Sequence, residues 1–197
     1  QADFFIRTWR SDEYGNTAEE FVDYLKREGI DSRCNFPVVH ILEDNADNAP
    51  PPKPPLNIAP WAPNFLTMWW GIVESHRLFK EYVANTGTKY DMVFRMRTDM
   101  VPEGDIDLTK YTDPTKMYNA KNFGDNFLFG TPEMYEQFVG YWDFLDNFSA
   151  AEAFIHPEES LELYFQINQI PYERIDTVVQ PTWDKGEYKG RWRSDHQ

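Results

Sequence analysis

Arg95, Arg97 and Asp99 stand at alternate positions in the apolar segment 90–102. Side chains alternate between the two faces of a strand, so Arg95 and Arg97 are expected on one face, roughly 6–7 Å apart. Guanidinium groups on a buried face are costly unless an anion meets them. Asp99 follows where the strand is expected to end, and a carboxylate there suits Mg²⁺ or Mn²⁺, which also takes oxygens from a diphosphate. The spacing therefore predicts a site for a phosphate-bearing ligand and a metal ion.

The segment 90–97 is the clearest strand in the sequence, and the other expected elements alternate around it. Strands are expected over 3–9, 36–42, 117–120, 126–129 and 174–179, and helices over 17–28, 64–85, 132–148 and 157–169. Thr17 and Glu20 have capping-box spacing at the start of one helix, and Gly29 is its expected stop. Alternating strands and helices predict an α/β domain with a mainly parallel mixed sheet flanked by helices.

Residues 43–63 have a composition that interrupts this alternation. They are acidic and rich in asparagine first, and then contain Pro50–Pro52, Pro54, Pro55, Pro60 and Pro63. Proline sustains neither a helix interior nor an interior strand, so we expect a long surface loop. Such a loop is either a lid on the acceptor side of a site or an inert connector.

The ends of the chain carry two further expectations. Residues 182–197 form a polar C-terminal tail that we expect to be loosely held. The sequence begins inside an expected strand, which suggests that residues upstream are missing. The domain is therefore expected to occupy residues 1–181.

Charge and composition exclude some classes of protein. With 197 residues, 19 Lys and Arg against 33 Asp and Glu, and a net charge of −14, the chain fits one domain that repels nucleic acid. A nucleotide diphosphate is repelled too, unless local arginines and a metal ion receive it. Aromatic residues make up 17%, which suits stacking on sugars and bases, although core packing accounts for most of them. The single cysteine, Cys34, forms no intrachain disulfide, and no apolar run is long enough for a transmembrane segment, so a cytoplasmic location is expected.

Four segments resemble, in the same order, those of one enzyme family. Residues 90–99 resemble the "YD-apolar-apolar-R-x-R-x-D" segment of GT-A glycosyltransferases that build bacterial surface polysaccharides and the glycans of large algal viruses. Residues 3–9 resemble the preceding "DFFIHTW" strand, 122–133 the "D-x-F-x-x-G-x-x-E" segment, and 154–161 the "PE-x-x-L" helix start. The resemblance implies a single GT-A-like, Rossmann-like domain.

The resemblance also implies roles for individual residues. Asp99 matches the surviving aspartate of the DxD metal motif, whose first position is here Arg97. His156 is either a late metal ligand or a structural hydrogen-bonding group, two interpretations of equal weight. The acidic candidates for a catalytic role are Asp125, Glu158 and Glu159, although acidic side chains also suit a helix start. Apart from the resemblance, the substrate-binding candidates are Arg7, Arg95 and Arg97, which either meet the diphosphate or brace Asp99, and Trp69, which is either a core residue or a ring that stacks on a base or sugar.

The function implied is sugar transfer from a nucleotide-diphosphate donor, with a UDP-sugar favoured, to the hydroxyl of a glycan or glycoprotein acceptor. Mn²⁺ or Mg²⁺ is the implied cofactor, and the host cytoplasm is the expected location if the protein is viral. Two alternatives remain at this point. One is a nucleotide-sugar hydrolase or nucleotidyltransferase, which needs the same site, and the other is a non-catalytic carbohydrate-binding module, in which aromatic rings carry the affinity.

Overall fold

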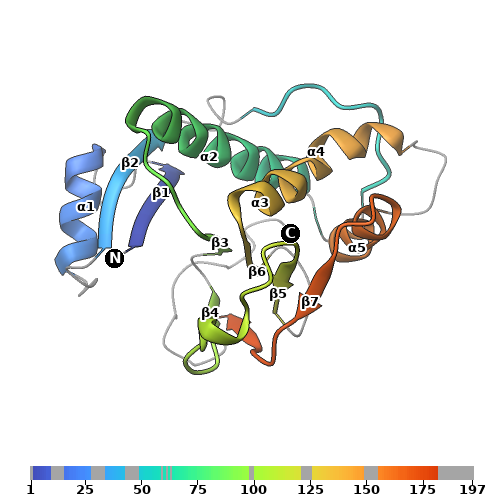
Figure 1. Cartoon of the computed structure of the whole chain (residues 1–197). Helices are drawn as coiled ribbons and strands as arrows, with labels where there is room; N and C mark the ends of the chain where they lie inside the picture. The colour runs from blue at the N-terminus through green and yellow to red at the C-terminus, as the bar shows by residue number, and fades with distance from the viewer. Residues whose placement is uncertain are drawn as a thin grey trace. The chain divides into compact units, whose positions relative to one another are not determined.

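The computed structural model describes residues 2–9, 16–27, 34–42, 49–58, 60, 62, 64–97, 100–120, 126–148 and 155–181. The chain divides into two compact units (Figure 1). Unit 1 comprises Gln1–Lys89 and Val139–Ile155, and unit 2 comprises Tyr90–Phe138 and His156–Gln197. Helices and small mixed sheets occur together, which confirms the α/β class. The expectation of one domain over residues 1–181 stays a prediction.

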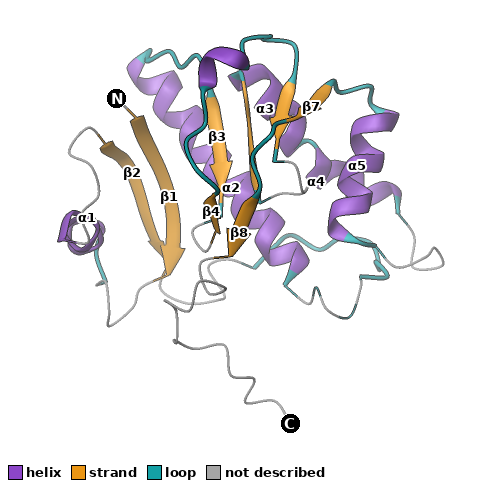
Figure 2. Cartoon of the chain, turned by 90° about the horizontal axis from the view of Figure 1, so that it is seen from below, coloured by secondary structure: helices purple, strands orange, loops and turns teal. Residues whose placement is uncertain are grey.

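Unit 1 is built from a parallel strand pair and helices. The strands β1 (Ala2–Trp9) and β2 (Cys34–Leu42) lie side by side, as Figure 2 shows. The helices are α1 (Ala18–Arg27), α2 (Phe65–Thr86) and α4 (Tyr141–Phe144), which continues into the 3-10 turn η3 (Leu145–Asn147). The ring of Phe5 on β1 meets those of Phe79 and Tyr82 on α2 edge-on, at centroid distances of 5.2 and 5.5 Å. Aromatic packing of this kind joins α2 to the strands.

The helix ends in unit 1 follow from local sequence signals. The amide of Glu20 donates to Thr17 Oγ1 at 3.2 Å, and Glu20 Oε2 accepts from the amide of Thr17 at 3.1 Å. This reciprocal pair is the expected capping box, and it satisfies two amides at the start of α1. The helix α2 ends at Gly87, whose φ of 68° is left-handed and whose amide donates to the Val83 carbonyl at 2.9 Å.

Unit 2 contains a four-stranded sheet in the order β3-β6-β5-β7. Its strands are β3 (Val93–Met96), β6 (Phe127–Gly130), β5 (Met117–Asn119) and β7 (Tyr172–Arg174). The other elements are β4 (Met100–Pro102), which pairs with β8 (Val179–Pro181), the 3-10 turn η2 (Leu108–Lys110), and the helices α3 (Pro132–Val139) and α5 (Pro157–Ile167). On one sheet face Tyr118, Phe127, Phe129 and Ile175 form a buried cluster.

Strand direction differs from the expectation of a mainly parallel sheet. Among the described residues, β1–β2 and β5–β7 are parallel, whereas β3–β6, β5–β6 and β4–β8 are antiparallel. The sheets are mixed, as expected, but without a parallel majority. The short connection from β5 to β6 explains part of the difference, because strands joined by a few residues reverse direction while parallel neighbours need a long crossover.

Two expected elements are divided in the structure. The helix expected over 132–148 is interrupted at Gly140, between α3 and α4, and its last turn is the 3-10 turn η3. The strand expected over 174–179 is replaced by the ends of β7 and β8, which pair with different partners. The C-terminal tail lies outside the described residues.

Replacing Gly130 with alanine is expected to destabilise the fold by about 1–3 kcal/mol, because the packed atoms around Gly130 leave no room for the new methyl group. A Cβ atom at Gly130 would lie 2.7 Å from Met117 Sδ, 3.2 Å from Met134 Cβ and 3.3 Å from the Lys116 carbonyl oxygen. The methionine tip can shift, but the other two atoms belong to a helix and a backbone. Urea unfolding monitored by circular dichroism measures the change in free energy of unfolding.

Gly71→Ala is the matched control. Gly71 lies within α2, and a Cβ atom there would meet nothing within 4 Å. Alanine is expected to stabilise by about 0.5–1 kcal/mol, because glycine loses more backbone freedom in a helix. Shifts of the same sign in the two variants would contradict the packing argument.

Candidate functional site

The strand β3 presents two different faces. Val93 and Arg95 are half-buried, whereas Phe94 and Met96 are 44% and 45% exposed. Arg97, directly after the strand, is half-buried like Arg95. The expected alternation is therefore confirmed, and both arginines lie on the more buried side of their segment. A half-buried guanidinium is partly desolvated, which strengthens its interaction with an anion.

Arg95 lies near a buried phenol from α3. The Nε atom of Arg95 is buried, and Tyr135 is buried beside Phe138, with ring centroids 5.4 Å apart. Burial raises the pKa of Tyr135 to about 12, and the positive charge of Arg95 acts in the opposite direction. Tyr135 is therefore neutral at physiological pH and close enough to interact electrostatically with Arg95.

Arg97 is held to the segment that begins β6. Its backbone amide donates to the Asn126 carbonyl at 3.0 Å, and its Nη1 lies 3.4 Å from Asn126 Oδ1. The first contact has ordinary hydrogen-bond length, and the second is long. The exit from β3 and the entry to β6 are therefore joined at this point, with an arginine and an amide side by side.

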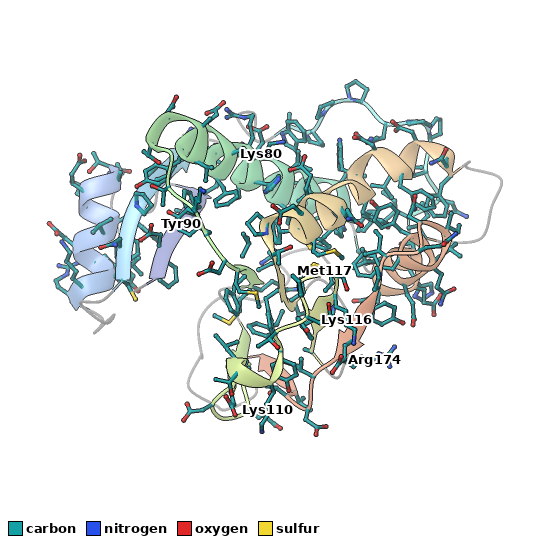
Figure 3. The ribbon with its side chains drawn as sticks, in the orientation of Figure 1. Lys80, Tyr90, Lys110, Lys116, Met117 and Arg174 are labelled. Carbon is teal, nitrogen blue, oxygen red and sulfur yellow. The ribbon has the colours of Figure 1, made fainter. Side chains whose placement is uncertain are left out.

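The positive groups at the opposite edge of the same sheet are already matched with carboxylates. Lys116 Nζ lies 3.0 Å from Glu173 Oε2, and this hydrogen bond raises the pKa of Lys116. Arg174 Nη2 lies 3.3 Å from Glu162 Oε1. Figure 3 labels Lys116 and Arg174 near β5 and β7. These carboxylates would compete with an incoming anion, so this edge is a weaker candidate for phosphate.

The start of α5 positions His156, Glu158 and Glu159. His156 is half-buried and extended at the N-cap, and its carbonyl accepts from the amide of Ser160 at 2.9 Å and from Ser160 Oγ at 2.6 Å. Its imidazole makes no capping hydrogen bond to the helix. Glu158 and Glu159 are exposed in the first turn, where the helix dipole favours acidic groups. They are accessible to a solvent-borne hydroxyl.

Arg7 and Trp69 belong to unit 1. Arg7 is half-buried on β1, in register with His40 of β2. Trp69 is 0% exposed, and its ring lies 4.5 Å from that of Tyr141. A fully buried indole presents no face to a ligand, so Trp69 is a core residue in this structure rather than a substrate-binding one.

Asp99 and Asp125 lie outside the described residues, so their metal-binding and catalytic roles stay predictions. Within the part of the chain that the structure describes, no three His, Cys, Asp or Glu side chains are gathered to hold a metal ion. Among the described residues at the end of β3, Arg95 and Arg97 present guanidinium groups, which suit phosphate oxygens rather than a cation. A metal ion at this place therefore depends on Asp99 and its neighbours.

Two residues of this region were not predicted from the sequence. Asn126 forms part of an expected strand, and nothing in its local context indicates that it would meet Arg97. Tyr135 follows the apolar Met134 and precedes Phe138 by one helical turn, a spacing typical of a core residue. Both roles arise from tertiary contacts.

Comparison with known proteins adds no assignment, since the chain matches no protein-family model, no curated protein and no solved structure. Of the helices in the described ranges, none has both the length and the apolar character needed to cross a membrane.

Proposed function

We propose that the chain is a metal-assisted glycosyltransferase that moves a sugar from a nucleotide-diphosphate donor, preferably a UDP-sugar, to a glycan hydroxyl. In this proposal residues 1–181 form one GT-A-like domain, and Arg95 and Arg97, at the end of β3, bind the diphosphate. The support comes from the arrangement of Arg95 and Arg97 together with the resemblance of residues 90–99 to the family segment.

The single observation that carries the proposal is the junction between Arg97 and Asn126. In the sequence Asp99 lies two positions after Arg97, and Asp125 lies one position before Asn126. The hydrogen bonds at this junction therefore join the two chain segments that lead to the predicted acidic residues. A cationic group and an amide are in place at this junction, and the proposal adds the carboxylates of the two acidic residues that adjoin it in the sequence, a polar set of the kind a nucleotide-sugar site requires.

The arginines act on the leaving group. As the bond between the anomeric carbon and the diphosphate oxygen breaks, negative charge grows on the departing nucleotide diphosphate. Half-buried Arg95 and Arg97 donate hydrogen bonds to phosphate oxygens, and these charge-assisted bonds strengthen as that charge develops.

The metal ion would bind in the part of the site that is predicted from the sequence alone. Asp99, with His156 as a second ligand, would hold Mn²⁺ or Mg²⁺. A divalent cation there would neutralise part of the diphosphate charge, which the net charge of −14 otherwise repels.

The acceptor hydroxyl attacks the anomeric carbon and gives its proton to a carboxylate. Asp125, Glu158 and Glu159 are the candidates for this base. A base on the face opposite the diphosphate leads to inversion of the anomeric configuration, whereas transfer without such a base is compatible with retention.

A thermal-shift screen tests the proposal with UDP-, GDP- and CMP-sugars, each with and without Mn²⁺. One nucleotide sugar is expected to raise Tm, and more so with Mn²⁺, because a ligand of the folded state stabilises it. The sugar that binds is then incubated with and without glycan acceptors. Transfer to an acceptor supports the proposal, whereas free sugar as the sole product indicates a hydrolase. Stabilisation by glycans and by no nucleotide sugar would identify a carbohydrate-binding module and overturn the proposal.

A further inference from the structure

The Pro-rich segment 49–58 is part of unit 1 and contacts other elements of that unit without forming a helix or a strand. Figure 1 draws it as a cyan coil. Half of its ten residues are prolines, namely Pro50, Pro51, Pro52, Pro54 and Pro55. Its C-terminal end is attached by main-chain contacts, because the amide of Ile155 donates to the Asn57 carbonyl at 2.7 Å and Ile58 forms a parallel bridge with Ile155.

Lys53 attaches the middle of the segment to α4 and η3. Its side chain is only 5% exposed, and Nζ lies 3.0 Å from Asp146 Oδ1. The same ammonium group lies 4.4 Å from the ring centroid of Trp142. Trp142 also contacts Trp70 of α2, with ring centroids 5.5 Å apart. Lys53 thus covers a buried indole that belongs to the packing of unit 1.

The chemistry of this contact makes attachment reversible. Removing an ammonium group from water is costly, and only the attraction to its partners offsets that cost. One partner, Asp146, is 54% exposed, so solvent screens its charge, and the other is an aromatic face. An apolar side chain at this position would close the contact without such a cost. The state in which the segment is attached to Trp142 and Asp146 and the state in which it is released are therefore closer in free energy than they would be with leucine or methionine packed well at position 53.

The prolines lower the entropic cost of docking. Each proline has a fixed φ, so the free segment already samples few conformations and loses little freedom when it attaches. A stiff segment with one central attachment also moves as a unit, because its backbone does not bend freely on either side of Lys53.

We propose that residues 49–58 are a strap that opens and closes as a unit, with Lys53 as its latch on Trp142 and Asp146. Opening exposes the Trp142 ring and releases the amide of Ile155 from Asn57. The strap is a conformational device of unit 1 and does not depend on the proposed sugar transfer.

Amide hydrogen exchange of Ile155, measured by NMR on the full chain, tests the proposal. Lys53→Ala removes the ammonium group and most of the apolar stem, so the contacts with Trp142 and Asp146 are lost and exchange of the Ile155 amide is expected to rise about tenfold or more. Asp146→Asn is expected to have a smaller effect, because the indole contact remains. Exchange of amides inside α2, such as that of Phe79, is expected to stay unchanged in both variants.

Trp142→Phe provides an independent test that keeps the lysine. Phenylalanine retains a ring but attracts a cation less strongly than tryptophan, so faster exchange at Ile155 is again expected. Lys26→Ala is the matched control, since Lys26 is an exposed lysine of the same unit, 3.7 Å from Asp23, and its loss is expected to leave exchange at Ile155 unchanged.

Two results would overturn the proposal that residues 49–58 open and close as a strap. Unchanged exchange at Ile155 in both Lys53→Ala and Trp142→Phe would show that Lys53 is not a latch. Equal acceleration at Ile155 and inside α2 would show that Lys53 stabilises the whole unit instead of a segment that opens by itself.

Discussion

Replacing Arg95 with lysine is expected to lower kcat/KM for sugar transfer by roughly 100-fold, the scale of losing one preorganised donor to a transition-state charge. Lysine keeps the positive charge but lacks the planar fork that binds two phosphate oxygens at once. It also changes the group that lies beside Tyr135 on the half-buried side of β3. Steady-state kinetics with the nucleotide sugar found in the thermal-shift screen measure the effect.

Arg174→Lys is the control for this variant. The register runs from Arg95 to Leu128, from Leu128 to Asn119 and from Asn119 to Arg174, so the two arginines occupy the same row at opposite edges of the sheet. Arg174 is exposed and interacts with Glu162, and its replacement is expected to leave kcat/KM unchanged. Equal losses in both variants would indicate a general effect on the sheet and would remove Arg95 from the donor site.

Asp99→Asn is expected to reduce turnover by about 1000-fold and to abolish the extra thermal stabilisation that Mn²⁺ confers on the donor complex. Asparagine has nearly the same shape as aspartate, but its neutral amide is a poor ligand for a divalent cation. The Tm of the ligand-free variant is expected to equal that of the parent chain. Assays and thermal shifts with and without Mn²⁺ give both quantities.

Asp107→Asn serves as the comparison, because Asp107 caps the turn η2 and accepts from the amide and hydroxyl of Thr109 at 3.2 and 2.6 Å. This substitution is expected to leave metal-dependent turnover intact. If Asp99→Asn retained full turnover and full Mn²⁺ dependence, the metal role of Asp99 would have to be abandoned.

Elements with strong local signals were predictable from the sequence. The capping box at Thr17 and Glu20 begins α1 by contacts within a few residues. The prediction of β1, β2 and β3 succeeded because short apolar or alternating runs favour strands. Pairing direction was not predictable, since the partner of β3 is more than thirty positions away and the run of β3 is equally compatible with either direction.

The candidate site was predictable only where it depends on local sequence patterns. Strand periodicity placed Arg95 and Arg97 on the more buried side, because that periodicity is a local property. The neighbours of these arginines come from other elements, Asn126 before β6 and Tyr135 in α3, and no pattern around either residue indicates the contact. Trp69 had two possible roles in the sequence, core packing or stacking on a base or sugar, and its complete burial agrees with core packing.

The proline content of residues 49–58 also has a consequence for the behaviour of the protein at high concentration. Intermolecular sheet growth needs backbone N–H groups at regular intervals, and each proline removes one of them. With prolines at half of its ten positions, this stretch offers an incoming chain no continuous row of donors, even when it is detached from Trp142. The protein can therefore expose the segment repeatedly without creating a template for aggregation.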